Sequence, residues 1–592
     1  MRSVRRLSRP FAVLAGLWAA LILVLTLTPA AEMPRTPDWE LLSFDTAAHA
    51  GVFFVLVALA WLARQPAART AGAGLGLLAA AVAFGGLIEV LQYAMHLGRH
   101  ADWTDLLSDT IGAILALLLL ATWQRTFADR LTALGGVLLL ISTATAAQTP
   151  APPGPDLARA RRTIAALAAP GMHGRGYVRQ GEHEAAAYLR GRLRALGLSP
   201  LAPDFTQPFT LDVNTFPAGL GLSLLEKLPE KRLRPGHDFI AAPESGSCYN
   251  PTEYAAQPLD TLVFSDTTTR KGYLLLAMFN NSRNNLHITH TSRVEPLAIV
   301  LRARDAARLP TLPPELQRFF AEVPLLVLHL KLTASLADSQ SPQPVLHLLE
   351  ECWPLNAAGQ LSAQRIRLEV DAEFLRNYPT QNIAAVIRGT IQPDSFLVIS
   401  AHYDHLGMMG KTAYFPGAND NASGVALLLE LAAHYARPEN RPAYSIAFLL
   451  FGAEEAGLVG SRYFVAHPLL PLARIKFLLN LDLLGTGEAG ATVVNGRTHE
   501  AAYRRLVALN EAHHYLPALA ARGRAANSDH FPFSEAGVPA FFIYTRGGSP
   551  AYHDVNDRPE ALSLTGFAGA YGLLRDFTLR LMRNEDAALN EE

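Results

Sequence analysis

Residues 396–405 read FLVISAHYDH, an apolar run that ends in His402 and Asp404. A short apolar run of this kind predicts a buried β-strand, and its polar end marks the carboxyl tip of that strand. The stretch that follows, PGANDNASG at 416–424, predicts a polar loop that leads into a helix and carries Asp420. We therefore expect three polar side chains to gather just beyond one buried strand.

Two further apolar runs end in acidic residues. SIAFLLFGAEEAG at 445–457 ends in the adjacent Glu454 and Glu455, and IKFLLNLDLLG at 475–485 ends in Asp482. Neighbouring side chains leave the backbone in different directions, so the two glutamates are expected to serve different purposes.

A fourth strand, AFFIY at 540–544, precedes the loop GGSPAYHDVND, which presents His553. Binding sites of open α/β sheets form in the crevice beyond the carboxyl ends of the strands. We therefore expect the polar residues of all four strand ends to meet in one crevice.

From Asn382 onward, strand-like and helix-like runs alternate. They are Phe396–Ala401, Val425–Tyr435, Ser445–Phe451, Leu458–His467, Lys476–Leu481, His499–His514, Ala540–Tyr544 and Ser563–Met582. Such alternation predicts an α/β fold, a mixed and mostly parallel sheet with helices on both faces.

The segment before this sheet is organised differently. Residues 157–198 contain two helical patterns, and Gly197 is a natural helix end. Residues from about 203 to 375 have frequent turns and no His or acid cluster at ligand spacing. Their short strand-like runs at Gly272–Met278, Leu297–Leu301 and Leu325–Leu330 predict an inserted β-rich domain.

The first 147 residues hold five apolar stretches: Phe11–Leu27, Thr46–Leu62, Gly72–Ala94, Leu106–Trp123 and Leu131–Ala147. Several are near the short end of what crosses a bilayer, which predicts an all-α transmembrane bundle of four or five helices. Arginines precede the first stretch and stand between the second and third and between the fourth and fifth. The positive-inside rule then predicts a cytoplasmic N-terminus and an extracytoplasmic C-terminal part.

The fifth stretch has two interpretations. Arg125 and Arg130, the apolar run LTALGGVLLLIS and the sequence Ala144-Thr145-Ala146 also resemble a signal peptide with a cleavage site. Cleavage would release the C-terminal part, whereas retention would anchor it, and we expect the anchored form. The following residues 148–156, QTPAPPGPD, predict a linker.

Polar residues within this section form a recognisable set. They are Asp45, His49 and Phe53, then Glu89 and Gln92, then Arg99, Asp102, Asp105 and Gly112. This set resembles the VanZ-like membrane family over about residues 10–125, with Asp109 standing where Asn is expected. These groups either pair with one another to lock the bundle or line a binding pocket for a lipid or cell-wall precursor.

The residues at the strand ends suit a metal pair. Zinc accepts His nitrogen and carboxylate oxygen, and hydrolytic sites leave a position for water. Two such ions about 3.5–4 Å apart can share a water, lower its pKa and polarise a carbonyl group. One carboxylate must then stay unligated to act as the base.

The motifs HYD, GANDNASG, GAEEAG, NLDLLG and YHDVND stand in the order of the M28 family of zinc aminopeptidases, which residues 157–583 resemble. The resemblance implies a first zinc ion held by His402, Asp420 and Asp482. It implies a second zinc ion held by Asp420, Glu455 and His553, so that Asp420 bridges the two.

The same resemblance assigns roles to the two remaining acids. Glu454 would be the general base on the metal-bridging water, and Asp404 would orient His402. One departure is Leu483, which stands where the family often has Met. The loop Ser528–Pro539 fits as a border of the substrate cleft, and the β-rich insert stands where many members carry a protease-associated domain.

Each of these motifs has a bland alternative. An HxD at a strand end is usually a polar turn, Asp420 could cap a helix, Glu454-Glu455 could open a solvated helix, and His553 could lie on the surface. Coincidence becomes improbable only when six such residues occur in one family's order. Of the other histidines, His405 and His530 lie closest to the motifs.

We therefore predict a membrane-anchored di-zinc exopeptidase that removes N-terminal residues from peptide or protein substrates. A carboxypeptidase or a glutaminyl-cyclase-like enzyme on the same fold is an alternative, although the cyclases use one zinc. A further alternative is a non-catalytic peptide-binding module whose functional part is the VanZ-like section.

The composition agrees with a peptidase section and a membrane section in one chain. The 592 residues carry a net charge of −1, so no basic footprint for nucleic acid is expected, and the partners are peptide and lipid bilayer. Cys248 and Cys352 are the only cysteines. They are either two unrelated buried thiols or, in an exported domain, one disulfide. The predicted divisions are 1–130, 131–156 and 157–592, the last with the insert at about 203–375.

Overall fold

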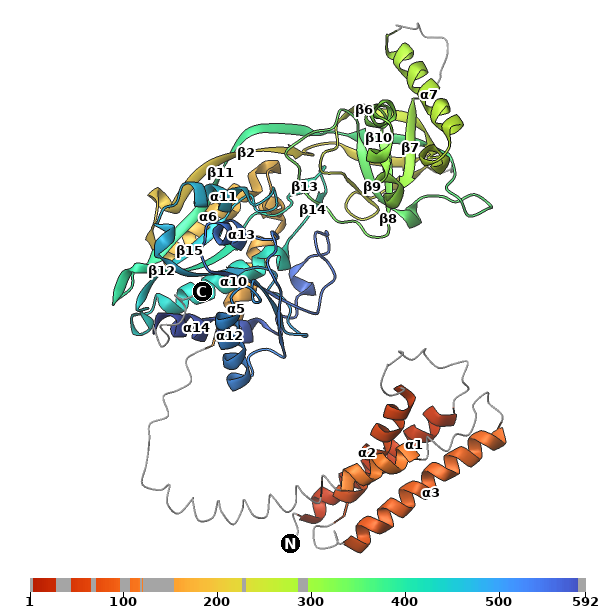
Figure 1. Cartoon of the computed structure of the whole chain (residues 1–592), viewed down its shortest axis with the longest axis vertical. Helices are drawn as coiled ribbons and strands as arrows, with labels where there is room; N and C mark the ends of the chain where they lie inside the picture. The colour runs from red at the N-terminus through yellow and green to blue at the C-terminus, as the bar shows by residue number, and fades with distance from the viewer. Residues whose placement is uncertain are drawn as a thin grey trace. The chain divides into compact units, whose positions relative to one another are not determined.

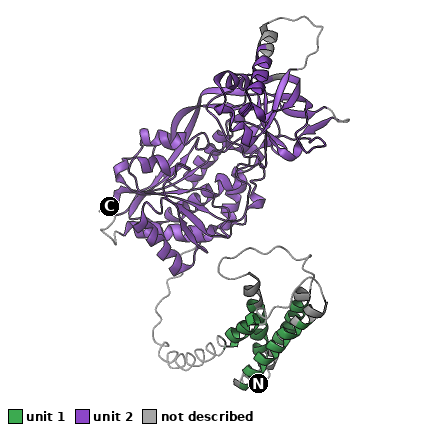
Figure 2. Ribbon diagram, turned by 45° about the vertical axis from the view of Figure 1, so that its right-hand side comes forward, with its two compact units in different colours: residues 1–151 green, residues 152–592 purple. Residues whose placement is uncertain are grey.

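The computed structural model describes residues 4–27, 44–64, 71–95, 107–117, 120, 154–225, 230–285 and 296–583. The chain divides into two compact units, residues 1–151 and 152–592 (Figure 2). The finer division at residues 130 and 156 stays a prediction.

The N-terminal unit is helical. Its helices are α1 (Val4–Leu27), α2 (Phe44–Leu62), α3 (Ala71–Met95) and a helix over 107–117. They coincide with the first four apolar stretches, whereas the fifth stretch, 131–147, lies outside the described residues. A small core joins all four helices through Ile22, Phe53, Ala81 and Ala113, among others.

One glycine of the VanZ-like set permits a close helix contact. A Cβ atom on Gly112 would lie 2.0 Å from the backbone oxygen of Ala50 in α2, so only glycine fits there. Asp109, one turn earlier, is buried. Arg99, Asp102 and Asp105 and the side chains of Asp45, His49, Glu89 and Gln92 lie outside the described part of the chain.

The helical character predicted for this section is confirmed. Among the described residues, none of the helices has both the length and the mean hydropathy that a membrane crossing requires.

The C-terminal unit is built around a nine-stranded mixed sheet (Figure 1). Its strands, in spatial order, are β1 (Ser199–Pro200), β11 (Glu373–Ile387), β15 (Tyr444–Phe451), β12 (Gln392–His402), β16 (Ile475–Leu481), β19 (Ala540–Thr545), β17 (Ala491–Val494) and β18 (Leu519–Ala521), and β2 (Thr206–Thr215) pairs with β11. The four strands β15, β12, β16 and β19 run parallel to one another. Their carboxyl ends therefore meet at one edge, as the sequence predicted.

Helices cover both faces of this sheet. They are α5 (Leu157–Leu167), α6 (Gly181–Ala195), α10 (Gly424–Tyr435), α11 (Val459–Ala466), α12 (Glu500–His513), α13 (His530–Glu535) and α14 (Phe567–Met582). Alternation along β12 separates the two cores. Leu397 and Ile399 face the core shared with α5, α6, α10 and α14, while Phe396 and Val398 face the core shared with α11 and α13.

A second sheet of eight strands occupies the inserted region. In spatial order it contains β4 (Lys231–Leu233), β3 (Leu220–Leu224), β10 (Gln364–Val370), β6 (Cys248–Pro258), β7 (Leu297–Arg302), β8 (Leu325–His329), β9 (Val345–Leu349) and β5 (Phe239–Ala241). Helices α7 (Thr267–Asn285), α8 (Ala303–Ala306) and α9 (Pro314–Ala321) follow its strands, and α7 projects away from the sheet (Figure 1). The β-rich character predicted for the insert is confirmed.

Two expectations for this region were wrong. Gly272–Met278, expected to be a strand, lies within α7. Residues 206–215, expected inside the insert, form β2 and pair with β11 in the first sheet, so the two strands lead into the insert and out of it. For the cysteines, whose pairing the sequence left open, the structure has no disulfide between Cys248 and Cys352, and the Sγ atom of Cys248 lies 3.4 Å from the hydroxyl of Tyr254.

Candidate metal centre

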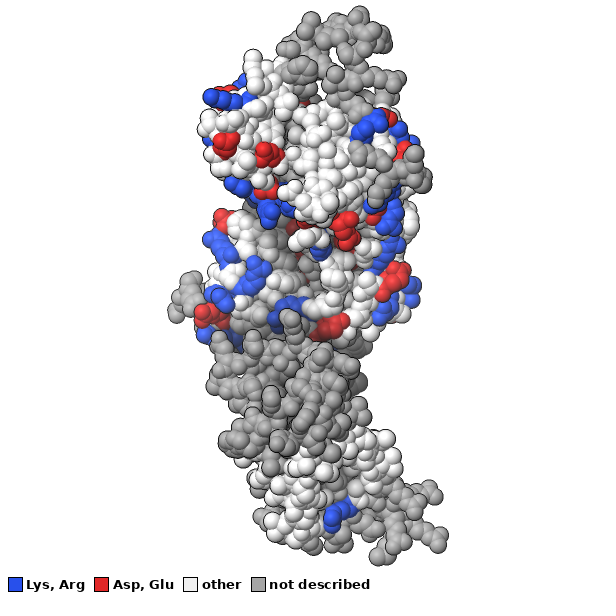
Figure 3. Space-filling model, turned by 90° about the vertical axis from the view of Figure 1, so that its right-hand side faces the viewer, with Lys and Arg blue, Asp and Glu red and all other residues white. Residues whose placement is uncertain are grey.

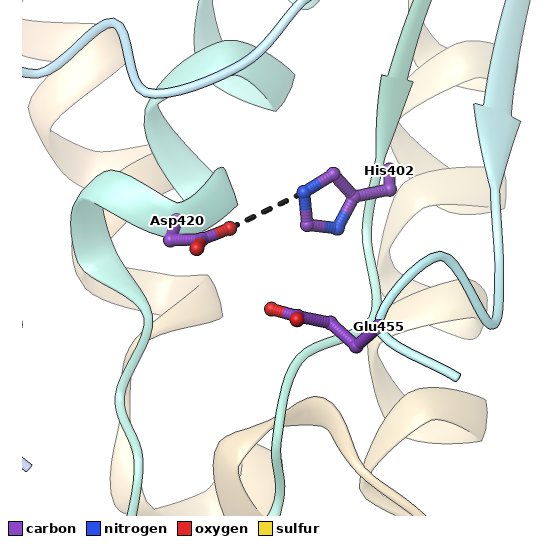
Figure 4. Close-up of side chains that lie close together, drawn as sticks. All are labelled: His402, Asp420 and Glu455. Atoms are coloured by element: carbon purple, nitrogen blue, oxygen red, sulfur yellow. Dashed lines mark ion pairs between the residues drawn. The ribbon is translucent and has the colours of Figure 1, made fainter. Parts of the chain in front are cut away.

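The centre begins with a histidine at the end of β12 and an aspartate in the loop that enters α10. The Nε2 atom of His402 lies 3.2 Å from Oδ1 of Asp420 and 3.5 Å from Oδ1 of Asp482, which follows β16. All three residues are buried. Figure 4 shows His402 and Asp420 facing one another, with Glu455 directed toward the same space.

The second histidine approaches from the other side of Asp420. The Nε2 atom of His553 lies 3.2 Å from Oδ2 of Asp420 and 3.1 Å from Oε2 of Glu455. The two oxygens of Asp420 therefore face two different imidazoles. This is the arrangement that a carboxylate shared by two cations requires.

Potential ligand atoms lie within 4.8 Å of one another in two overlapping groups: His402, Asp420 and Glu455, and His402, Glu454 and Asp482. No ion is present, so the fit is judged from the donors. The Oδ1 atom of Asp482 is buried and has no hydrogen-bond partner among the described atoms. A buried oxygen without a partner, beside histidine nitrogens and further carboxylates, fits divalent zinc.

Carbonyl groups fix which nitrogen of each imidazole is free. The Nδ1 atom of His553 lies 2.8 Å from the backbone oxygen of Ala334, and Nδ1 of His402 lies 3.2 Å from that of Asp404. A carbonyl oxygen can only accept, so both Nδ1 atoms carry hydrogen and donate it. In each imidazole, Nε2 is therefore the nitrogen directed toward the carboxylates, where a metal could replace its proton.

Asp404 holds the two glutamates through their backbone. Its Oδ1 atom accepts the N–H of Glu454 at 3.1 Å, and its Oδ2 atom accepts the N–H of Glu455 at 3.3 Å. Its Oδ1 atom also lies 3.7 Å from Nδ1 of His402. One buried carboxylate thus connects the end of β12 with the loop after β15.

Charges in the centre strongly influence one another. Burial by itself would lower the pKa of His553, but the carboxylates of Glu455 and Asp420 raise it to about 11. Burial would raise the pKa of Asp420, but hydrogen bonds from His402 and His553 lower it well below its usual range. Burial raises the pKa of Glu454 well above its usual range, and the attraction of His402 only partly offsets this.

A hydrogen-bonded chain of polar side chains supports Asp482 from behind. Ser400 donates to Asn480 at 2.8 Å, Asn480 donates to Ser528 at 2.8 Å, and Ser528 donates to Oδ2 of Asp482 at 3.1 Å. Ser528 belongs to the loop that the sequence placed beside the cleft, although its contact with Asp482 was not predicted.

His405 is a member of the site that sequence reasoning left aside. Its Nδ1 atom lies 2.7 Å from Oε1 of Glu455, and its ring is completely buried. The spacing H-Y-D-H could have identified it, because His405 follows the predicted ligand His402 by three residues. His530, the other histidine noted in the sequence, instead packs against Phe542 with ring centres 5.4 Å apart.

The polar groups line the floor of a cavity of about 220 Å³. Its remaining wall is formed by Leu483, Asn527, Phe542, Tyr544 and Tyr552. The ring of Tyr552 stacks on that of His553, with centres 3.9 Å apart. All seven residues predicted for the site therefore meet at this cavity or, for Asp404, directly behind it.

Comparison with known proteins agrees with this geometry. Residues 382–577 match the model of Peptidase family M28, and residues 8–124 match that of VanZ/LLP1. The chain carries an M28 peptidase domain. That match starts within β11 and ends within α14, so it spans every element that contributes a side chain to the centre.

Relatives of the M28 domain include zinc enzymes. The chain is 29% identical over 242 residues to aminopeptidase YwaD of Bacillus subtilis, covering 39% of this chain and 50% of the relative. It is 40% identical over 113 residues to a probable zinc metalloprotease of Pyricularia oryzae, covering 18% and 22% respectively. The chain thus spans about half the length of the first relative and about a fifth of the second.

A solved structure extends the similarity in fold beyond the M28 match. The zinc aminopeptidase BSAP of Bacillus subtilis superposes with a TM-score of 0.51 at 19% identity, over 74% of this chain and 97% of BSAP. The C-terminal unit therefore has an aminopeptidase-like α/β fold.

Proposed function

We propose that this chain is a membrane-anchored zinc aminopeptidase that acts outside the cytoplasm. The observation that carries the proposal is the position of Asp420, whose two carboxylate oxygens face His402 and His553 at 3.2 Å each. A surface cluster or a helix cap would not place one buried carboxylate between two imidazoles.

The residues would hold two zinc ions. His402, Asp420 and Asp482 would bind the first, and Asp420, Glu455 and His553 the second. Zinc, when bound, would lower the pKa of water and polarise the scissile carbonyl group. The names of the relatives support zinc, and the donor set of nitrogen and oxygen atoms suits it.

Glu454 is the proposed general base. Its carboxylate lies within 4.8 Å of potential ligand atoms of His402 and Asp482, at the side of the proposed first zinc ion. It would accept a proton from the attacking water and return it to the leaving amine nitrogen. Asp404 positions this base because it binds the backbone N–H groups of Glu454 and Glu455.

The cavity wall favours substrates whose N-terminal residue has a short apolar side chain. Leu483, Phe542, Tyr544 and Tyr552 offer apolar surface on one side of the polar floor. A cavity of about 220 Å³ is too small to enclose a folded polypeptide, so the end of a peptide chain is the expected substrate.

One experiment tests the peptidase proposal. The full chain, purified in detergent, is expected to bind about two zinc ions and to hydrolyse leucine p-nitroanilide but not its N-acetylated form. Chelation should abolish this activity, and zinc should restore it. Glu454→Gln should keep the metal and lose activity by about 100- to 10,000-fold. The same exchange at exposed Glu511 on α12 is the matched control.

The outcomes separate the alternatives. Hydrolysis of both substrates would contradict an aminopeptidase, and cleavage at the C-terminal end would indicate the carboxypeptidase alternative. Metal binding without hydrolysis in the wild-type chain would indicate a binding module.

The N-terminal unit is the proposed membrane anchor. Large apolar side chains point outward on its helices, including Val13 (61% exposed), Leu17 (64%), Leu75 (68%) and Val90 (62%). The described surface at the bottom of Figure 3 accordingly carries almost no Lys, Arg, Asp or Glu. Exposure of such an apolar surface to water is unfavourable, whereas the acyl chains of a lipid bilayer would cover it.

The anchoring proposal has its own measurement. The full chain should stay in the membrane fraction after extraction with alkaline carbonate, and a periplasmic-type reporter fused after Glu592 should be active. Release by carbonate would contradict anchoring, and an inactive reporter would contradict the orientation.

A further inference from the structure

A completely buried arginine lies beneath the candidate metal centre. Arg175, at the end of the short helical segment Pro170–Arg175, has no exposed surface. Its guanidinium group donates five hydrogen bonds, all to backbone carbonyl oxygens and, among the described residues, none to a carboxylate. Every donor of the side chain is therefore used, and none forms a conventional ion pair.

Four of these bonds reach segments that carry proposed ligands. The Nε atom donates to the oxygen of Tyr403 at 2.8 Å, directly after His402. The terminal nitrogens donate to the oxygens of Pro416 at 2.7 Å, Gly417 at 2.8 Å and Asp420 at 3.0 Å. The fifth bond, to Leu167 at 3.0 Å, ties the arginine to the end of α5.

A buried aspartate holds the opposite side of the Asp420 segment. The carboxylate of Asp557 accepts the N–H of Asn419 at 2.9 and 3.1 Å and that of Asp420 at 3.0 Å. Asp557 is completely buried and lies four residues after His553. The backbone N–H of Asp420 thus donates to the carboxylate of Asp557, and its carbonyl oxygen accepts from the guanidinium group of Arg175.

Gly417 shows how closely this segment is held. A Cβ atom there would lie 2.2 Å from the oxygen of Asp420 and 2.6 Å from a terminal nitrogen of Arg175, and the residue has a φ of +57°. Both the space and the backbone conformation therefore require glycine.

We propose that Arg175 and Asp557 are a pair of positioning residues that set the place of Asp420 between the two metal sites. This inference rests on the proposed function, because it assigns Asp420 to both metals. Residues that orient a ligand without touching the metal change metal affinity, by about 10- to 100-fold where such partners have been removed. Arg175 precedes residue 382, so the pair makes the metal centre depend on a segment outside the M28 match.

The alternative is that the pair only stabilises the fold. Arg159 provides the matched control, because it also ties α5, the first helix of the C-terminal unit, to the rest of that unit. Its guanidinium group donates to Glu430 on α10 twice, each bond 2.6 Å long, and neither bond reaches a ligand-bearing loop. A purely structural role would give Arg175 and Arg159 variants the same behaviour.

The experiment compares Arg175→Met, Arg175→Lys, Asp557→Asn and Arg159→Met in the full chain. Zinc affinity is measured by competition with a chelator, and thermal unfolding is measured on the same samples without metal. Arg175→Met and Asp557→Asn are expected to lose about 10- to 100-fold in zinc affinity. Arg175→Lys should recover part of it, and Arg159→Met should lower stability while leaving zinc affinity unchanged.

Two results would overturn the inference: wild-type zinc affinity in Arg175→Met and Asp557→Asn, or an equal loss of affinity in Arg159→Met. Should Arg175→Met fail to fold, Asp557→Asn and Arg175→Lys decide the question. A wild-type chain that binds zinc but cleaves no peptide would reject the proposed function alone, because the affinity comparison remains valid.

Discussion

The two sheets of the C-terminal unit share one architectural feature and differ in its use. In the nine-stranded sheet, β15, β12, β16 and β19 are parallel, and in the eight-stranded sheet β6, β7, β8 and β9 are parallel. Both sheets therefore collect side chains at a carboxyl edge. A cavity lies at each edge, of about 220 Å³ in the first sheet and about 620 Å³ in the second.

The chemistry of the two edges is different. At the first edge, buried carboxylates outnumber the histidines and one carboxylate oxygen has no hydrogen-bond partner among the described residues. At the second edge, Glu350 is paired with Arg302 at 2.7 Å, and both side chains are about one-third exposed. Parallel strands therefore provide a place where side chains gather at either edge, but in the described part of the chain only at the first edge do buried carboxylates beside histidines form a donor set that suits a metal ion.

The largest expected effect lies at the first edge. Asp420→Asn removes the charge that the two proposed metal sites share, so zinc content should fall to near zero and activity by at least about 1000-fold, or about 4 kcal/mol. Metal analysis and peptide hydrolysis on the same sample measure both. Full zinc content in this variant would contradict this account of the first edge, because zinc would then bind there without a charged carboxylate shared by two sites.

A smaller effect is expected from a histidine in the second sheet. Burial, assisted by the nearby His329, lowers the pKa of His347 on β9 to about 4, from about 6.5 when unfolded. The unfolded chain therefore binds more protons between these values. The contribution of His347 to the free energy of unfolding is therefore fully present above about pH 6.5. It is lost as the pH falls to about 4, and the total loss is on the order of 3 kcal/mol.

His347→Gln should remove that part of the pH dependence. Denaturant unfolding at pH 7, 6, 5 and 4 measures it, with His237→Gln as a control in the same sheet region. An identical pH profile in wild type and His347→Gln would show that the fold does not lower the pKa of His347.

The next effect concerns the contact between the sheets. Val555 lies between His553 and Asp557, yet its side chain is 3% exposed and belongs to the core of the eight-stranded sheet. Val555→Ala should lower the free energy of unfolding by about 1–3 kcal/mol through the lost apolar contacts. It should also weaken zinc binding. Lower stability with unchanged zinc affinity would show that the loop holds His553 without help from this core.

The smallest effect is expected at the second edge. Arg302→Gln breaks the partly exposed ion pair with Glu350, which is worth at most about 1 kcal/mol. Peptide hydrolysis and zinc content should stay within about twofold of wild type. A large loss of activity would mean that the second cavity contributes to catalysis and that the contrast between the edges is wrong.

Sequence reasoning succeeded where a pattern corresponds to one structural rule. Apolar runs with polar ends located β12, β15 and β16, and the carboxyl-end rule then brought His402, Glu455 and Asp482 to the same edge. It failed at Gly272–Met278, because a short apolar run is compatible with a strand or a helix, and this one lies in α7.

Other features have no signal in a single sequence. Arg175 could not be identified because its partners are backbone carbonyl groups, which every residue possesses. The start of the insert was misplaced because the pairing of β2 with β11 joins residues about 170 positions apart, and no local pattern encodes such a pairing. The roles assigned to the individual site residues stay predictions.

The link between His553 and Ala334 has a mechanical consequence. The imidazole of His553 donates to the carbonyl oxygen of Ala334, and the N–H of Ala334 donates back to the carbonyl oxygen of His553 at 3.1 Å. A movement of the eight-stranded sheet relative to His553 would therefore break both bonds and release the imidazole. Displacement of the insert is thereby coupled to displacement of a proposed zinc ligand, because both bonds join the same two residues.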